Sequence, residues 1–324
     1  MEKRKIIAVV GATGAQGGGL VRAILKDGKK EFAVRAITRD VKSKKAQELK
    51  ELGAEVVMAD LDDKDSIVKA FKGAYGAYCV TFFWDHYSPE KEMEQAKNMA
   101  QAAKEAGLKH VIWSTLEDTR KWVPLSDNRM PTLMGDYKVP HFDGKGASNT
   151  YFEQSGVPYT LLLTSFYWDN FIYFGSGPAR GMDGKLWITM PIGSAKLPGI
   201  AAEDIGKSAL GIFKAGKKYQ NKTVGISGEH LTGNEMAEAF TKVFGIEIGF
   251  NDIPADDYRK LGFPGADDLG NMFQFKNEFE DDFCGARDVN FTRELNPSLM
   301  PFKTWLIKNK GLLESGIKGE AAMA

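Results

Sequence analysis

The chain has 324 residues, of which 43% are hydrophobic and 27% are charged, so it can bury a sizeable core. Its 43 basic and 43 acidic residues cancel, which argues against nucleic acid or an anionic membrane as a partner. The two cysteines, Cys79 and Cys284, form neither a disulfide framework nor a zinc motif. No apolar run approaches the roughly 20 residues of a membrane span. We expect a globular protein of the cytoplasm or nucleus with no metal.

Short apolar runs alternate with amphipathic stretches through the first half of the chain. Expected strands cover Ile6–Val10, Ala33–Ile37, Glu55–Met58, Ala77–Val80, His110–Trp113 and Tyr159–Leu163. Expected helices cover Gly17–Lys26, Ser43–Leu52, Asp65–Phe71, Glu90–Glu105 and Lys145–Gln154. This order, with nearly continuous apolar strands, predicts an α/β fold: a Rossmann-type, doubly wound parallel sheet with helices on both faces.

The pattern breaks between Leu116 and Asp143, where three prolines occur without any clear period. A structureless connection of this length is often a binding loop or lid. The second half is less regular. Its expected strands are Leu186–Met190 and Thr223–Ile226, and its expected helices are Ala202–Phe213, Asn234–Phe244 and Ala255–Lys260, with a frayed tail from Gly316 to Ala324. We predict a Rossmann domain over residues 1–165 and a smaller C-terminal α/β domain over 166–324, partly interleaved with the first.

The strongest motif is Gly11-Ala12-Thr13-Gly14-Ala15-Gln16-Gly17, between the first strand and the first helix. Glycines allow a tight turn and a close approach of the backbone to a pyrophosphate, which the helix N-terminus then attracts. The spacing is G-x-x-G-x-x-G, not the G-x-G-x-x-G of the dehydrogenase fingerprint. A turn without a ligand is the alternative, but the surrounding strand–helix series favours dinucleotide binding.

The end of the second strand distinguishes between the two nicotinamide dinucleotides. Arg39 is suited to the 2′-phosphate of NADP, whereas Asp40 is suited to the ribose 2′-hydroxyl of NAD. Three lysines follow closely, although they also fit a solvated helix face. We expect NADP(H), with NAD(H) as the less favoured alternative. Asp60, at the end of the third strand, is placed to meet the adenine.

Four segments together resemble the NmrA-like family, and more narrowly its NADPH-sensor branch, within the atypical short-chain dehydrogenases/reductases. They are the glycine motif, Thr38-Arg39, His141-Phe142-Asp143-Gly144-Lys145-Gly146 and Tyr167-Trp168-Asp169-Asn170. The resemblance is clear from Lys5 to about Asp183 and looser to about Leu313. The glycine motif alone is common, but its combination with the His141–Gly146 segment is more specific.

The resemblance implies a role for each matching position. Gly11, Ala12, Thr13, Gly14, Ala15 and Gln16 would hold the pyrophosphate, Arg39 the 2′-phosphate, and Asp60 and Leu61 the adenine. Thr81, Phe82, Phe83 and Lys145 would contact the nicotinamide-side ribose, and Tyr167, Trp168, Asp169 and Asn170 would close over the nicotinamide end. Phe82-Phe83 departs from the Asn-Tyr pair that is more typical of the family at these positions.

The catalytic Tyr-x-x-x-Lys pair of the superfamily is absent. The tyrosine position is taken by His141, one helical turn before Lys145, and Tyr137 is too far from the lysine. Histidine can act as a general acid, but the neighbouring lysine and the nearby helix start disfavour its protonation. His141, with Ser114 after the fifth strand to polarise a carbonyl, is therefore only a candidate catalytic group.

Three functions remain open. The first is a non-catalytic NADP(H) sensor that regulates a protein partner, as the resemblance implies, with residues 116–140 as a candidate switch. The second is an NADPH-dependent reductase of a small carbonyl or quinone-like compound. The third is a scaffold without ligand binding, against which the glycine motif, Arg39 and Lys145 argue. We expect a regulator more than an enzyme, and a monomer or homodimer.

Overall fold

The computed structural model describes residues 4–317, which form two compact units. Of these residues, the first unit comprises 4–121, 140–164 and 203–225, and the second comprises 122–139, 165–202 and 226–317. The chain passes from the first unit into the second after residue 164, beside the predicted boundary at residue 165. Each unit also contains residues that the prediction assigned to the other domain. Residues 318–324 of the predicted frayed tail lie outside the described residues.

A seven-stranded parallel sheet forms the centre of the first unit. Its strands are β1 (Lys5–Val9), β2 (Phe32–Thr38), β3 (Glu55–Met58), β4 (Gly76–Cys79), β5 (His110–Thr115), β6 (Tyr159–Leu163) and β11 (Lys222–Gly225). Their order in the sheet is β11-β6-β5-β4-β1-β2-β3, and all neighbouring strands run parallel. This is the Rossmann order with one more strand, so the predicted fold class is confirmed. The order reverses between β1 and β4.

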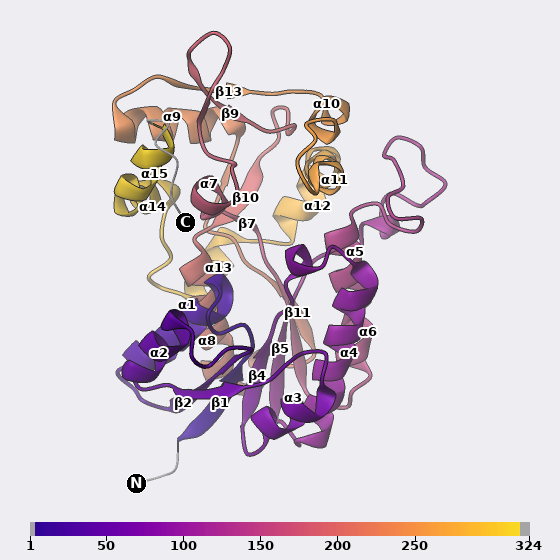
Figure 1. Cartoon of the computed structure of the whole chain (residues 1–324), viewed down its shortest axis with the longest axis vertical. Coiled ribbons are helices and arrows are strands. Elements are labelled where there is room, and N and C mark those ends of the chain that lie inside the picture. Colours follow the sequence, from indigo (N-terminus) through magenta and orange to yellow (C-terminus); the bar gives the residue numbers. More distant parts are fainter. Residues whose placement is uncertain (1–3, 318–324) are drawn as a thin grey trace. The chain divides into compact units, whose positions relative to one another are not determined.

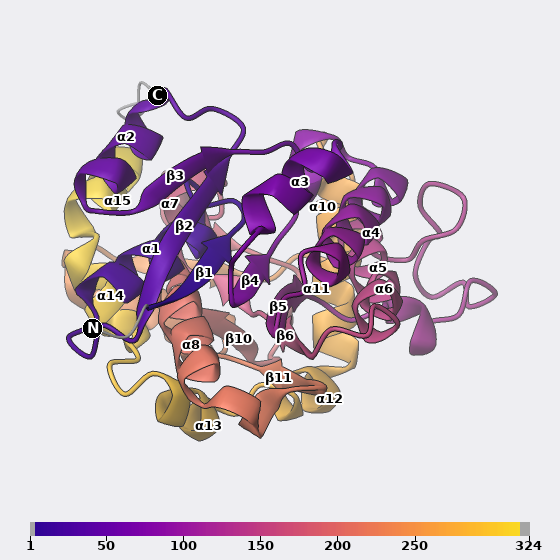
Figure 2. The same cartoon turned by 90° about the horizontal axis from the view of Figure 1, so that it is seen from below.

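Helices cover both faces of this sheet (Figures 1 and 2). One layer contains α1 (Ala15–Lys26), α2 (Lys44–Glu51) and α8 (Ala202–Lys214). The opposite layer contains α3 (Lys64–Phe71), α4 (Pro89–Glu105), α5 (Pro140–Ala147) and α6 (Asn149–Glu153). Short 3-10 turns complete the unit: η1 (Phe83–Asp85), η2 (Thr119–Lys121) and η3 (Gly216–Tyr219). Cys79, predicted to be a core residue, is fully buried in β4.

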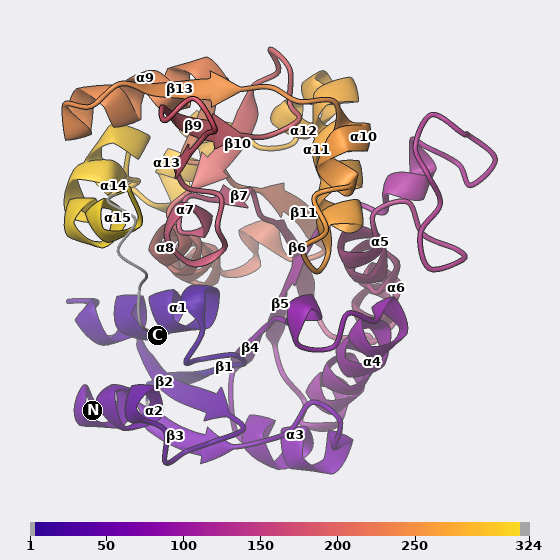
Figure 3. The same ribbon diagram turned by 45° about the horizontal axis from the view of Figure 1, so that its top comes forward.

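The core of the first unit lies between the sheet and the layer of α3, α4 and α6. Trp113 on β5 stacks on Phe152 of α6 with 4.9 Å between ring centroids, and both side chains are buried. Both α5 and α6 pack along α4, as Figure 3 shows. Because α4 buries one face only, its apolar residues recur at helical spacing, from Pro89 through Ala96 and Met99 to Ala103.

The second unit contains two small mixed sheets and most of the C-terminal helices. One sheet has the order β12-β10-β7 and the other β13-β9-β8. Its strands are β7 (Phe166–Tyr167), β8 (Ala179–Arg180), β9 (Leu186–Thr189), β10 (Leu197–Ile200), β12 (Glu229–Leu231) and β13 (Ile248–Asn251). Its helices are α7 (Asn170–Tyr173), α9 (Gly233–Phe244), α10 (Ala255–Arg259), α11 (Ala266–Glu278), α12 (Glu280–Gly285), α13 (Val289–Leu295), α14 (Phe302–Lys308) and α15 (Lys310–Ile317). Aromatic side chains, including Phe171, Phe240 and Phe302, pack together in its core.

Two expectations about local structure are wrong. The helix predicted over Lys145–Gln154 is two helices: α5 begins earlier, at Pro140, and α6 follows. The irregular segment is correspondingly shorter than 116–143. Nearly all of α5 is buried, so it shows no amphipathic period that sequence reasoning could detect. Within residues 4–317, no helix has the length and apolar character needed to cross a bilayer.

Candidate functional site

A glycine-rich turn joins β1 to α1. Gly11 has a φ of +62°, which favours glycine, and a Cβ added at Gly17 would lie 2.4 Å from the carbonyl oxygen of Gly11. α1 begins at Ala15, and its N-cap residue, Gly14, has no side chain that could cap the helix. The turn thus places the exposed residues Gly11, Gly14 and Ala15 at a helix N-terminus, which is the geometry that attracts a pyrophosphate. These residues fit a bound dinucleotide.

The sheet topology brings most of the other predicted residues to the same edge. The carboxyl ends of parallel strands meet there, and ligands of such sheets bind where the strand order reverses, here between β1 and β4. Arg39 follows β2, Asp60 and Leu61 follow β3, and Thr81, Phe82 and Phe83 follow β4. Ser114, expected after the fifth strand, is instead the last residue but one of β5. Lys145 lies on α5 and contacts Thr81.

The two residues proposed to distinguish NADP from NAD have different environments. The Arg39 side chain is 71% exposed, and its Nη2 donates a hydrogen bond to Oδ2 of Asp85 at 2.7 Å. The carboxylate of Asp40 instead accepts a hydrogen bond from the backbone nitrogen of Lys42 at 2.8 Å, within a local turn. Asp60 similarly accepts from the backbone nitrogen of Asp62 at 3.0 Å.

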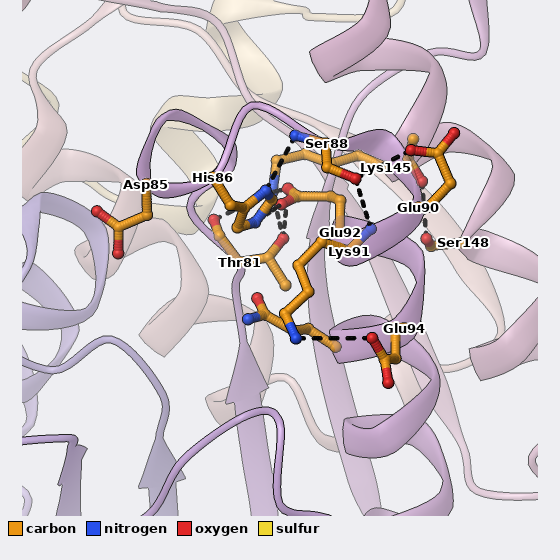
Figure 4. A network of polar contacts seen from close by, with 12 residues as sticks. Thr81, Asp85, His86, Ser88, Glu90, Lys91, Glu92, Glu94, Lys145 and Ser148 are labelled. Atoms are coloured by element: carbon orange, nitrogen blue, oxygen red, sulfur yellow. Dashed lines mark hydrogen bonds and ion pairs between the residues drawn. The ribbon is translucent and has the colours of Figure 1, made fainter. Parts of the chain in front are cut away.

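A buried polar cluster holds Lys145, and we name its four members, Thr81, His86, Glu92 and Lys145, the Lys145 cluster (Figure 4). The ammonium of Lys145 lies 2.6 Å from Oε1 of Glu92 and donates to Oγ1 of Thr81 at 2.6 Å. The Thr81 hydroxyl in turn donates to Glu92 at 2.6 Å. Nε2 of His86 lies 3.4 Å from Oε2 of Glu92, an ion-pair distance without hydrogen-bond geometry.

Glu92 is the most deeply buried charged group of this cluster, with no exposed side-chain surface. Burial alone would raise its pKa, but the charge of Lys145 and hydrogen bonds from its neighbours outweigh burial and lower the pKa to about 2. Glu92 is therefore ionised at neutral pH. Its carboxylate compensates the charge of Lys145, whose own side chain is only 11% exposed.

The two candidate catalytic residues both contact other protein groups. His141, in the first turn of α5, is buried among aromatic rings, with its ring centroid 5.0 Å from that of Trp84 and 5.9 Å from that of Phe83. The hydroxyl of Ser114 donates to Oε1 of Gln16 at 2.7 Å, and the hydroxyl of Tyr78 donates to the same oxygen. Ser114 thus supports the glycine turn through Gln16.

The predicted residues Tyr167 to Asn170 belong to the second unit. Trp168 is 1% exposed and packs in that unit's aromatic core, with ring centroids 5.2 Å from Phe302 and 6.3 Å from Trp305. Asp169 accepts a hydrogen bond from the backbone nitrogen of Ala202 at 2.9 Å. The role of this segment at the nicotinamide end stays a prediction.

Comparison with known proteins agrees with this architecture. The model of the NmrA-like family matches residues 3–304 of the chain. The chain belongs to the NmrA-like family. An NmrA-like family domain-containing protein of Dictyostelium discoideum is 32% identical over 266 residues, which cover 79% of this chain and 83% of the relative. The NmrA-like family domain-containing oxidoreductase ptmS of Penicillium ochrochloron is 27% identical over 92% of this chain and 91% of its own.

Solved structures share the fold of this family member at lower identity. NmrA, a negative transcriptional regulator in complex with NAD, superposes with a TM-score of 0.79 at 23% identity over 98% of each chain. An NADPH-dependent quinone oxidoreductase of Escherichia coli in complex with NADPH superposes with a TM-score of 0.73 at 21% identity, over 94% of this chain and 99% of its own. Both regulators and reductases therefore use this fold.

Sequence reasoning missed Glu92, His86, Tyr78 and Asp85. A signal existed for Glu92, because it falls on the apolar face of α4, three residues after Pro89 and four before Ala96. A carboxylate at such a position must have a buried partner. No sequence signal pairs Asp85 with Arg39, which lies 46 residues earlier.

Proposed function

We propose that this chain binds NADP(H) at the carboxyl ends of β1 and β4 and acts as a cofactor-responsive regulator, not as a reductase. The Lys145 cluster is the observation that supports a regulatory role over a reductase activity. In a reductase of this superfamily the lysine cation would lower the pKa of a proton donor one helical turn away. Here the charge of Lys145 is compensated by Glu92, and the residue one turn away is a buried histidine.

Cofactor binding is supported by the fit of the glycine turn, where a Cβ at Gly17 would collide with backbone. Relatives of the same fold are described in complex with NAD, NADP or NADPH. Bound nicotinamide would supply a hydride donor or acceptor. The chain's own residues would hold the pyrophosphate through the N-terminus of α1, and Lys145 and Thr81 would contact the adjacent ribose.

The side chains after β2 support the proposed preference for NADP over NAD. Arg39 presents an exposed guanidinium, whose planar fork suits a phosphate. The Asp40 carboxylate already accepts a backbone hydrogen bond within its own turn, so it is less available to accept one from a ribose hydroxyl. A regulator of this kind would act on a protein partner through conformations that differ in cofactor affinity.

Titration of the purified protein with NADP⁺ and NAD⁺, followed by calorimetry, tests the binding site. Arg39→Glu is expected to weaken NADP⁺ binding by about 10- to 100-fold, because charge-assisted hydrogen bonds to the phosphate are lost. Binding of NAD⁺ should change little. Lys50→Glu, the same charge reversal on α2, serves as the control. Equal weakening of both cofactors by Arg39→Glu would refute the 2′-phosphate assignment, and absence of binding at millimolar concentration would refute the proposal as a whole.

A reductase remains the second candidate, because several relatives are named oxidoreductases and because Phe82, beside the proposed site, exposes half of its surface. We expect no sustained NADPH oxidation with a panel of carbonyls and quinones, monitored at the nicotinamide absorbance. Turnover that His141→Ala abolishes, while NADPH binding persists, would instead identify an enzyme with His141 as the proton donor.

A further inference from the structure

The ion pair between Arg39 and Asp85 joins the two sides of the proposed cofactor site. Arg39 follows β2 and Asp85 ends η1, shortly after β4. In the sheet these two strands flank β1, whose carboxyl end carries the glycine turn. The two side chains meet at 2.7 Å. Figure 4 shows the Asp85 carboxylate pointing away from the Lys145 cluster, although Asp85 directly precedes His86.

We propose that Asp85 is an intramolecular competitor for Arg39, which the 2′-phosphate of NADP must displace and which NAD leaves in place. This inference rests on the proposed function, and it assigns a specificity-determining residue to the same site. The carboxylate of Asp85 forms an ion pair with the Arg39 guanidinium, which would otherwise be available to bind a phosphate. Asp85 thereby lowers the preference for NADP and links the 2′-phosphate to the loop between β4 and α4.

Charge and exposure explain why the 2′-phosphate of NADP can replace the Asp85 carboxylate on Arg39. A phosphate monoester carries about −1.5 to −2 charges at pH 7, against −1 for a carboxylate, and offers more acceptor oxygens to the guanidinium. The 2′-hydroxyl of NAD is neutral and has no means to displace a carboxylate from arginine. Arg39 and Asp85 are 71% and 42% exposed, and ion pairs so exposed are weak enough to open readily.

The displaced residue lies in a segment that also contacts the Lys145 cluster. His86 faces Glu92, and its Nδ1 accepts a hydrogen bond from the backbone nitrogen of Ser88 at 3.1 Å. Release of Asp85 from Arg39 would therefore remove one contact that holds the loop between β4 and α4. The next residue of that loop, His86, lies against Glu92, the buried partner of Lys145. This arrangement lets the protein respond to NADP differently from NAD.

Calorimetric titration of Asp85→Asn with NADP⁺ and NAD⁺ at low and high salt tests the inference. We expect NADP⁺ to bind about two- to fivefold more tightly than to the natural protein, because the cost of opening the ion pair is removed. The affinity for NAD⁺ should stay unchanged, and the gain for NADP⁺ should shrink at high salt. Glu90→Gln removes an equal charge five residues later, in the first turn of α4, without altering the pair with Arg39, and should leave both affinities unchanged.

Three outcomes would overturn the inference. The first is an unchanged NADP⁺ affinity in Asp85→Asn while Arg39→Glu still weakens NADP⁺, which leaves the proposed function standing. The second is an equal gain in Asp85→Asn and Glu90→Gln, which would reflect overall charge alone. The third is a gain from Asp85→Asn that persists in the Arg39→Glu background, since the competition requires Arg39. Failure of the proposed function would look different from all three outcomes, because Arg39→Glu would then not weaken NADP⁺ binding more than NAD⁺ binding.

Discussion

Replacement of Glu92 by Gln is expected to lower the free energy of unfolding by about 3–5 kcal/mol. The carboxylate is fully buried and lies 2.6 Å from the Lys145 ammonium, so its removal leaves a nearly buried cation without a countercharge. The variant keeps the side-chain shape and an acceptor oxygen for Thr81. Equilibrium unfolding in urea at neutral pH measures the change.

Two further variants separate this buried pair from an ordinary ion pair. Glu105→Gln breaks the exposed pair with Lys64 at the other end of α4, where the atoms lie 3.2 Å apart, and should cost less than about 1 kcal/mol. The double variant Glu92→Gln/Lys145→Met should recover much of the loss, because it removes both charges. If Glu92→Gln costs no more than Glu105→Gln, the Lys145 cluster does not hold the fold together.

Acid should also reveal the contribution of Glu92. Its pKa in the folded protein is about 2, below the ordinary 4.5, so its stabilisation is complete above pH 4.5 and is lost as the pH falls toward 2. The stability difference between the natural protein and Glu92→Gln is therefore expected to narrow over that interval. A difference that stays constant down to the lowest measurable pH would contradict this prediction.

Stability is expected to fall by about 3 kcal/mol between pH 6.5 and pH 4 because of His110. This residue is fully buried at the start of β5, and burial lowers its pKa from 6.5 to about 4. Its Nε2 lies 2.8 Å from the hydroxyl of Thr160, which itself donates to the carbonyl of Tyr219. Nε2 must therefore carry the proton, and among residues 4–317 the buried Nδ1 has no hydrogen-bond partner that could accept a second one.

His110 makes the protein less stable in acid because the folded and unfolded states bind its proton at different pH values. Between pH 6.5 and 4 the unfolded chain protonates His110 and the folded protein does not, so acid favours unfolding. Above pH 6.5 the contribution is constant. His110→Gln keeps a donor toward Thr160 but does not ionise, so its unfolding free energy, measured in urea across this range, should depend less steeply on pH. Identical slopes in the two proteins would exclude His110 as the source.

The α/β fold class followed from local patterns. The glycine turn and the alternation of apolar strands with helices are properties of short segments, because turn geometry and strand burial on both faces constrain the residues themselves. The same reasoning failed where burial is complete. α5 lies inside the protein, so its start at Pro140 had no periodic signal, and the helices after residue 260 were also missed.

By itself, the sequence determined the strand order along the chain, the glycine turn and the residue types available at its edge, because these depend on neighbours in the chain. Only the tertiary structure decided which charges meet. Glu92 compensates Lys145, and Asp85 occupies Arg39, through contacts between residues 53 and 46 positions apart. Such pairings depend on which strands lie side by side in the sheet and on which helix faces are buried, and local patterns do not encode either property.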